Sequence, residues 1–199
     1  KDLIKNVNFG ALAVNADEDI AVMINEEDHI REQCITDGFD LDGAYKKILR
    51  VDEKISEKLD IAFDPVLGYL TDCPTNLGAA MRASVMVFLP ALTMTKKIDR
   101  LINDLQRLEF TTRGVYGEGS TAQGFMYQIS NQATVGKSEE DIIKLVKKTV
   151  GSIIEIERKE RENLKNTHGV ELQDKIMRAF GILTNCYLID SAEFSELLG

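Results

Sequence analysis

The sequence predicts an α+β fold, in which a mostly antiparallel sheet is flanked by helices and followed by a C-terminal helical segment. Two observations support this prediction. Before Gly136, short apolar runs follow one another across polar turns or single helices, which favours hairpin-like pairing over a regular strand-helix-strand winding. After Gly136, the apolar residues recur at helical spacing only.

The first elements expected are a hairpin and a helix. Residues 9–25, FGALAVNADEDIAVMIN, have apolar alternation on both sides of a polar turn at residues 15–18, which predicts two antiparallel strands. Residues 40–59 begin with Asp40, a residue type suited to an N-cap, and continue with an apolar stripe at helical spacing. We therefore expect a helix over residues 40–59.

The middle of the chain is expected to supply the remaining strands. Apolar runs predict strands at residues 67–72 and 83–89, and the segment that starts at Pro90 predicts a helix over residues 90–108. Two further strands, LEFTTRGVYG and FMYQISNQ, are expected around a glycine-rich connection.

The C-terminal part is predicted to be helical. Ser138 is suited to an N-cap and is followed by acids in the first turn, so we expect a long amphipathic helix to about residue 164. Residues 170–198 predict two or three shorter helices. Because no Pro/Gly/Ser-rich linker occurs, we place a boundary within the long helix, between a domain of residues 1–151 and one of residues 152–199.

Composition limits the classes of function. A chain of 199 residues with 44% hydrophobic residues can bury one sizeable core, and its net charge of −9 argues against non-specific nucleic-acid binding. No apolar run approaches the roughly 20 residues of a membrane helix. The three cysteines, Cys34, Cys73 and Cys186, lack C-x-x-C spacing, which indicates reduced thiols. We expect a cytoplasmic protein that contacts neither membrane nor nucleic acid.

Three short segments carry the candidate chemistry. Each lies at the end or the start of a predicted strand and contains an arginine: NEEDHIR, CPTNLGAAMR and RGVYGEGS. Three guanidinium groups can clamp a polyphosphate, and paired carboxylates can hold a guanidinium substrate and accept its proton. Arginines would also favour the thiolate form of a nearby cysteine. For any one segment alone, a solvated turn or a glycine-rich loop remains the alternative interpretation.

The combination of motifs resembles a known family. In order and internal spacing, NEEDHIR, CPTNLG followed by RASV, and RG…GE followed by ISNQ resemble the phosphagen (guanidino) kinases, and most closely their bacterial protein-arginine kinase branch. The resemblance implies a guanidino-kinase, glutamine-synthetase-like catalytic domain over residues 1–151 that lacks its N-terminal part. It implies that residues 152–199 begin a C-terminal helical domain.

The implied reaction is transfer of the γ-phosphoryl group of ATP to a guanidino nitrogen, which in this branch belongs to an arginine side chain of a protein. Mg²⁺ is expected to arrive with the nucleotide, because it binds mainly through phosphates and water, and no protein-only metal site is expected.

The resemblance also assigns roles to individual residues. The catalytic residues would be Glu27, Cys73 and Glu118. The residues that position the substrate would be Glu26, Thr75 and Asn76. The residues that bind the ATP phosphates would be Arg31, Arg82 and Arg113. Within this set the two catalytic glutamates would anchor the guanidinium and accept its proton, and the threonine hydroxyl would hydrogen-bond the thiolate.

Two departures from the small-molecule members favour the protein-arginine branch. Met86 and Gln128 stand where those members usually have histidine and aspartate. The implied partners are arginine-containing protein substrates, a heat-shock repressor, an activator protein, a Clp-type protease and a second copy of the chain in a homodimer. Two alternatives remain open: a non-catalytic module that binds phosphoarginine or nucleotide, and a kinase of a small free guanidino compound.

Overall fold

The structure is a computed structural model that describes residues 9–114 and 125–198. It divides into two compact units. The first comprises Lys1–Ala83 and Ala133–Leu145, and the second comprises Ser84–Gln132 and Val146–Gly199. The boundary predicted between residues 151 and 152 stays a prediction.

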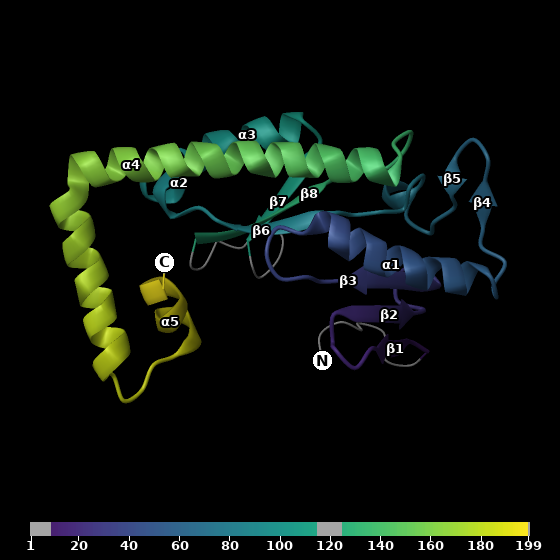
Figure 1. The fold of residues 1–199 in the computed structure, drawn as a ribbon, viewed down its shortest axis with the longest axis horizontal. Helices are drawn as coiled ribbons and strands as arrows, with labels where there is room; N and C mark the ends of the chain where they lie inside the picture. The colour runs from purple at the N-terminus through teal and green to yellow at the C-terminus, as the bar shows by residue number, and fades with distance from the viewer. Residues whose placement is uncertain (1–8, 115–124, 199) are drawn as a thin grey trace. The chain divides into compact units, whose positions relative to one another are not determined.

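The first unit contains a three-stranded antiparallel sheet in the order β1-β2-β3 (Figure 1). The predicted hairpin is confirmed as β1 (Ala11–Val14) and β2 (Ile20–Ile24), and the Asn15 side chain closes the turn by accepting from the Ile20 amide at 2.9 Å. The third strand, β3 (Ile30–Cys34), was not predicted. Its sequence, IREQC, has too few apolar residues to show alternation, and its pairing with β2 decides its conformation.

One helix packs against this sheet. The predicted helix is confirmed as α1 (Leu41–Ser56), with Asp40 as N-cap accepting from the Gly43 amide at 2.9 Å. The helix contacts β3. An ion pair of 2.6 Å also joins Lys47 Nζ on the helix to Oδ2 of Asp19, the residue that precedes β2.

The strand predicted over residues 67–72 is much shorter in the structure. Here β4 (Phe63–Asp64) pairs with β5 (Gly68–Tyr69), Tyr69 also forms an isolated bridge with Gly78, and the short 3₁₀ helix η1 (Pro74–Asn76) follows β5. The last backbone hydrogen bond here runs from the Leu70 amide to the Ala62 carbonyl at 2.9 Å, and the Thr71 hydroxyl then donates to the Cys73 carbonyl at 2.8 Å.

The second unit contains the other three-stranded antiparallel sheet, in the order β6-β8-β7. Its strands are β6 (Ser84–Phe88), β7 (Phe110–Gly114) and β8 (Met126–Asn131), at the three places where strands were expected. The region of residues 90–108 is helical as predicted, but it is not one continuous helix. It is two helices, α2 (Pro90–Met94) and α3 (Ile98–Arg107), because Lys96 adopts a left-handed φ of 57° between them.

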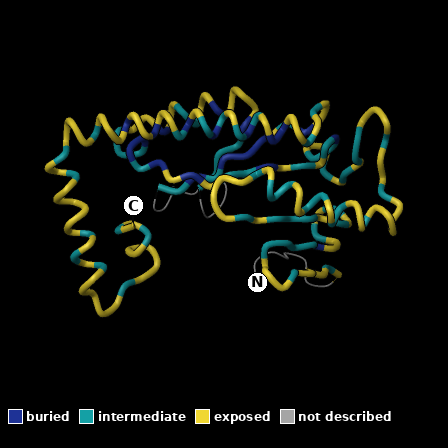
Figure 2. Tube along the Cα trace, viewed as in Figure 1, coloured by how far each residue is buried: buried dark blue, intermediate teal, exposed yellow. Residues whose placement is uncertain are grey.

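The core of the second unit lies between this sheet and its helices. Figure 2 shows buried positions along β6, β8, α2 and one face of α4. The largest fully buried side chains of this unit are Phe110, Leu89, Leu92, Ile129, Ile153, Val146 and Val150. Antiparallel strands flanked by helices confirm the predicted fold class.

The long helix α4 (Glu139–Asn185) begins after Ser138, whose hydroxyl accepts from the Asp141 amide at 3.2 Å, as predicted. Its first part ends near residue 168, close to the expected end at about residue 164, and its second part lies within the helical region predicted over residues 170–198. A kink at His168, where φ is −133° and ψ is 31°, separates its two parts (Figure 1). The last helix is α5 (Ser191–Leu198). None of the helices in the described part of the chain has the length and apolar character needed to cross a membrane.

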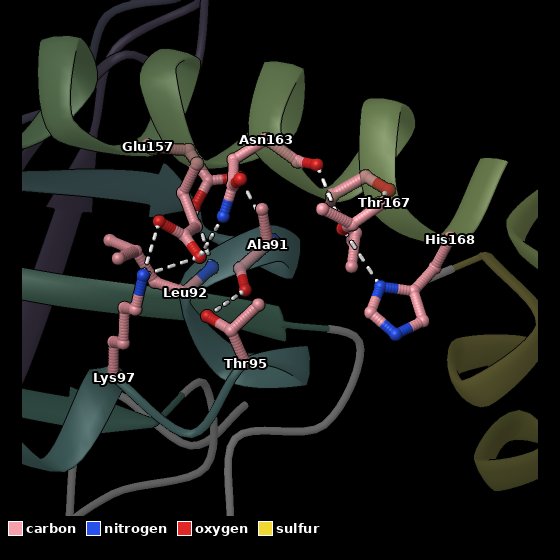
Figure 3. Close-up of polar contacts among 10 residues, drawn as sticks. Ala91, Leu92, Thr95, Lys97, Glu157, Asn163, Thr167 and His168 are labelled. Carbon is pink, nitrogen blue, oxygen red and sulfur yellow. Dashed lines mark hydrogen bonds and ion pairs between the residues drawn. The ribbon is translucent and has the colours of Figure 1, made fainter.

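A buried carboxylate joins α4 to α2 (Figure 3). The Glu157 side chain is 4% exposed, and its two oxygens accept from the backbone amides of Ala91 and Leu92, each at 3.0 Å. Arg161 Nε donates to the same carboxylate at 2.7 Å. The Glu157 carboxylate thus accepts hydrogen bonds from backbone amides in the first turn of α2, which have no acceptor within the helix. A negative group is favoured at this end of a helix.

We expect Glu157→Gln to lower the free energy of unfolding by about 2–4 kcal/mol, because a buried amide NH₂ would face a backbone donor and charge-assisted hydrogen bonds would be lost. Urea denaturation measures this change. Glu155→Gln is the matched control, since Glu155 is 62% exposed and pairs only with Arg158 on the same helix. Equal effects of the two substitutions would contradict the role given to Glu157.

Candidate active site

The acidic turn between β2 and β3 presents the first group of predicted site residues. The Asn25 amide donates to the His29 carbonyl at 3.0 Å, and Asn25 has a left-handed φ of 54°, so residues 25–29 form a tight connection. The turn presents Glu26 and Glu27, whose side chains are 15% and 43% exposed. Glu27 is therefore the more accessible of the two carboxylates.

A guanidinium group lies against both carboxylates. Arg31 Nη1 is 3.3 Å from Glu26 Oε2 and 3.6 Å from Glu27 Oε2. Arg31 was predicted to bind ATP phosphates, and that role stays a prediction. The ion pair places a predicted phosphate-binding arginine next to two predicted acceptor-side acids.

The loop of residues 73–78 carries the second group of predicted residues. Cys73 is half-buried, and its Sγ lies 3.0 Å from the Thr75 hydroxyl. The backbone amide of Asn76 donates to the backbone carbonyl of Cys73 at 2.9 Å, which closes the single turn of η1. The structure thus places the predicted cysteine and threonine side by side.

A hydrogen bond connects the acidic turn to the cysteine loop. The backbone amide of Asp72 donates to Asp28 Oδ1 at 2.7 Å, across 44 residues of sequence. Sequence analysis did not single out Asp28, although it is the third acid of NEEDHIR. This contact brings the turn that carries Glu27 and the loop that carries Cys73 together within the first unit.

The other predicted residues belong to other segments of the chain. Arg82 is exposed, just before β6. Arg113 lies on β7, where its cross-strand partner is Gln128, and Gln128 in turn pairs with Met86 on β6. The two positions that depart from the small-molecule members are therefore neighbours in the sheet, in the same row as Arg113. Glu118 lies outside the described residues.

Carboxyl groups close to the site have shifted pKa values. Burial raises the pKa of Glu32, on β3 next to Arg31, to about 7, and the charge of Asp52 on α1 adds to this effect. Burial also raises the pKa of Asp52, with a further contribution from Glu139 at the start of α4. Groups of three or more metal-binding side chains are absent from the described ranges.

We expect the raised pKa of Glu32 to make the stability of the fold depend on pH. The folded state keeps a proton on Glu32 up to about pH 7, whereas an ordinary glutamate releases it near 4.5. The free energy of unfolding should therefore fall as the pH rises between these values. Because Glu32 is half-exposed and water screens its charge, we expect Glu32→Gln to be more stable than the wild type at pH 8 by only about 1 kcal/mol.

Urea denaturation at pH 5 and pH 8 tests this expectation. Glu57→Gln, at the exposed C-terminal end of α1, serves as the control and should leave the pH dependence unchanged. If Glu32→Gln has the same pH dependence as the wild type, the assignment of the shift to Glu32 is wrong.

Comparisons with known proteins identify the family of the chain. Residues 1–160 match the family described as ATP:guanido phosphotransferase, C-terminal catalytic domain. The chain is 52% identical over 198 residues to a protein-arginine kinase of Clostridium acetobutylicum, covering 100% of this chain and 58% of the relative. It is 47% identical over 190 residues to a protein-arginine kinase of Bacillus subtilis, covering 96% of this chain and 52% of the relative. The chain thus spans just over half the length of these relatives.

Solved structures of guanidino kinases have a similar fold. A lombricine kinase aligns with a TM-score of 0.66 at 32% identity, over 72% of this chain and 40% of its own. The duplicated taurocyamine kinase of Schistosoma mansoni, with bound transition-state analogue components, aligns with a TM-score of 0.71 at 28% identity, over 88% of this chain and 25% of its own. Since the family match extends over most of the chain, the chain belongs to the ATP:guanido phosphotransferase family.

Proposed function

We propose that the protein is an ATP-dependent protein-arginine kinase, which transfers the γ-phosphoryl group of ATP to the guanidino group of arginine side chains in proteins. The observation that carries this proposal is the hydrogen bond from the Asp72 amide to Asp28, which brings the turn of Glu26 and Glu27 together with the Cys73 loop. The names of the relatives support the choice of a protein as acceptor.

The two acids suit the chemistry of a guanidino acceptor. An arginine side chain has a pKa of roughly 12.5 or above, so a base must take a proton before its nitrogen can attack phosphorus. Glu27 is the more exposed carboxylate and serves as anchor and base, while Glu26 helps to position the substrate. The resemblance assigns the second such carboxylate to Glu118.

In the transfer step the acceptor nitrogen displaces ADP from the γ-phosphorus. The lone pair of the deprotonated nitrogen forms the N–P bond while the bond from the γ-phosphorus to its bridging oxygen breaks. ADP leaves with that electron pair, and the guanidinium proton goes to the carboxylate. Positioning and charge stabilisation supply most of the rate enhancement in such reactions.

Cys73 and its neighbours complete the acceptor side. A Cys73 thiolate would place a negative charge beside the acceptor guanidinium, and the Thr75 hydroxyl at 3.0 Å would donate to it. Asn76 ends the turn of η1 and helps to position the substrate in the proposal.

Arginines suit the nucleotide side. Arg31, Arg82 and Arg113 would bind the ATP phosphates, because guanidinium groups carry permanent charge and make bidentate hydrogen bonds to phosphate oxygens. Arg82 is exposed just before β6, and Arg113 lies on β7 opposite Gln128. Mg²⁺ would bind with the triphosphate and neutralise part of its charge.

The proposed partners follow from the family resemblance. They are protein substrates that carry arginine, a heat-shock repressor, an activator protein, a Clp-type protease and a second copy of the protein in a homodimer. On the same basis we propose that the protein acts in the cytoplasm during the stress response.

The acceptor can be identified by comparing a folded basic protein, an arginine-containing peptide and free arginine, each with ATP and the full-length protein at two salt concentrations. We expect faster transfer to the protein and the peptide. The preference for the basic protein should weaken at high salt, because the chain's net charge of −9 attracts it over long range. Faster reaction with free arginine would indicate a small-guanidino kinase, and ATP binding without transfer would indicate a binding module.

A further inference from the structure

The segment that follows β8 holds the Cys73 loop in place. Thr134 is 6% exposed, and its hydroxyl lies 2.7 Å from the Leu77 carbonyl oxygen and 3.2 Å from the Thr75 carbonyl oxygen. The hydroxyl group therefore has two carbonyl oxygens of the loop as acceptors for its one proton, and the Leu77 oxygen is the closer of the two. The Thr134 carbonyl in turn accepts from the Ala79 amide at 3.3 Å.

Close backbone contact accompanies these hydrogen bonds. Gly78 has a φ of +103°, and a Cβ added there would lie 2.8 Å from both the Thr134 carbonyl oxygen and Val135 Cα. On its other side Gly78 pairs with Tyr69, whose amide donates to the Gly78 carbonyl at 2.8 Å. The C-terminal half of the loop is thus fixed between two segments, and no side chain fits at Gly78.

We propose that Thr134 is a positioning residue for Cys73. Thr75 connects the two, because its hydroxyl lies against the Cys73 thiol while its carbonyl accepts from Thr134. The Thr134 hydroxyl acts through the backbone of the loop and fixes where the Thr75 hydroxyl, and hence the thiol, can lie. This inference rests on the proposed function, in which Cys73 faces the acceptor guanidinium.

The test uses Thr134→Val, which keeps the branched shape and removes the hydroxyl. In the full-length protein we expect kcat to fall about tenfold with the KM for ATP unchanged, because a small misplacement of reacting groups slows transfer without affecting the nucleotide. Alkylation of Cys73 by iodoacetamide, followed by mass spectrometry, should be about threefold slower at pH 7, with the rate–pH profile moved to higher pH. Thr134→Ser retains the hydroxyl and should behave as the wild type in both assays.

Thr93→Val is the matched control, because the Thr93 hydroxyl also donates to a carbonyl, that of Leu89 at 2.7 Å, and contacts the Tyr127 hydroxyl at 2.9 Å. It should lower the melting temperature to a similar extent and leave the kcat and the Cys73 alkylation profile unchanged. If Thr134→Val does not fold, Thr134→Cys, which has a similar size and only a weak donor, carries the same expectation.

The proposal is wrong if a folded Thr134→Val protein has the wild-type alkylation profile, or if Thr134→Ser is impaired as much as Thr134→Val. The alkylation assay needs no acceptor and no turnover. It therefore tests Thr134 even if the wild type transfers phosphate to no acceptor, a result that would count against the proposed function alone.

Discussion

Glu27→Gln is expected to lower the kcat of phosphoryl transfer by about 10²- to 10⁴-fold, the usual contribution of a general base. Glutamine has the shape of glutamate but cannot accept the guanidinium proton. The Glu27 side chain is 43% exposed and 3.6 Å from the Arg31 guanidinium, so the substitution should not disturb packing. Initial rates at saturating ATP and acceptor measure this effect, and the ATP dissociation constant should stay nearly unchanged.

Two further variants separate the acceptor side from the nucleotide side. Arg82→Ala should weaken ATP binding by about 10- to 150-fold, because one charged hydrogen bond to phosphate contributes roughly 1.5–3 kcal/mol. Glu57→Gln, an exposed acid at the end of α1, should change neither quantity. The assignment would be overturned if Glu27→Gln abolished ATP binding and spared transfer.

Cys73→Ser is expected to lower kcat by about 10²-fold, a typical cost of removing one electrostatic contact to the reacting groups. A serine hydroxyl does not ionise at neutral pH, so the negative charge proposed beside the acceptor would be lost. Serine can keep the hydrogen bond to Thr75, and Cys73 is only half-buried, so the fold should be retained. Circular dichroism and urea denaturation check that the variant is folded.

Thiol labelling of the folded protein gives an independent check on Cys73. Burial raises the pKa of Cys34, and the charge of Asp19 raises it further, so this thiol should react slowly at neutral pH. Cys186 is exposed and serves as the reference for an accessible thiol. We expect alkylation to favour Cys73 over both, and ATP with acceptor to protect it. Equal labelling of the three thiols would contradict a reactive role for Cys73.

Local signals explain which elements of the fold could be predicted from the sequence. The β1–β2 hairpin and α1 were predicted because their turn and cap residues, Asn15 and Asp40, act on neighbouring backbone. The strand β3 is polar and is defined by its pairing with β2, which a local pattern does not report. The two parts of α4 were predicted as separate helices, because the polar residues around His168 interrupt the apolar spacing, and the structure has its kink at that position.

In the candidate site, too, local motifs could be recognised from the sequence and contacts between distant residues could not. The motifs NEEDHIR and CPTNLG were sufficient to select Glu27, Cys73 and Thr75. The residues that hold these segments together were missed, because their contacts cross long stretches of sequence: 44 residues from Asp28 to Asp72 and 57 from Leu77 to Thr134. Asp28 and Thr134 were given no role of their own from the sequence motifs, so their contacts with these segments are visible only in the folded chain.

The most direct test of the central claim is the chemical identity of the product. The full-length protein is incubated with ATP, Mg²⁺ and an arginine-containing protein, and the acceptor is then analysed by phosphorus NMR and mass spectrometry. We predict a phosphoramidate on arginine side chains, which acid removes and which is nearly absent with Glu27→Gln. Acid-stable phosphate on hydroxyl side chains, or unchanged acceptor in the presence of bound ATP, would contradict the account.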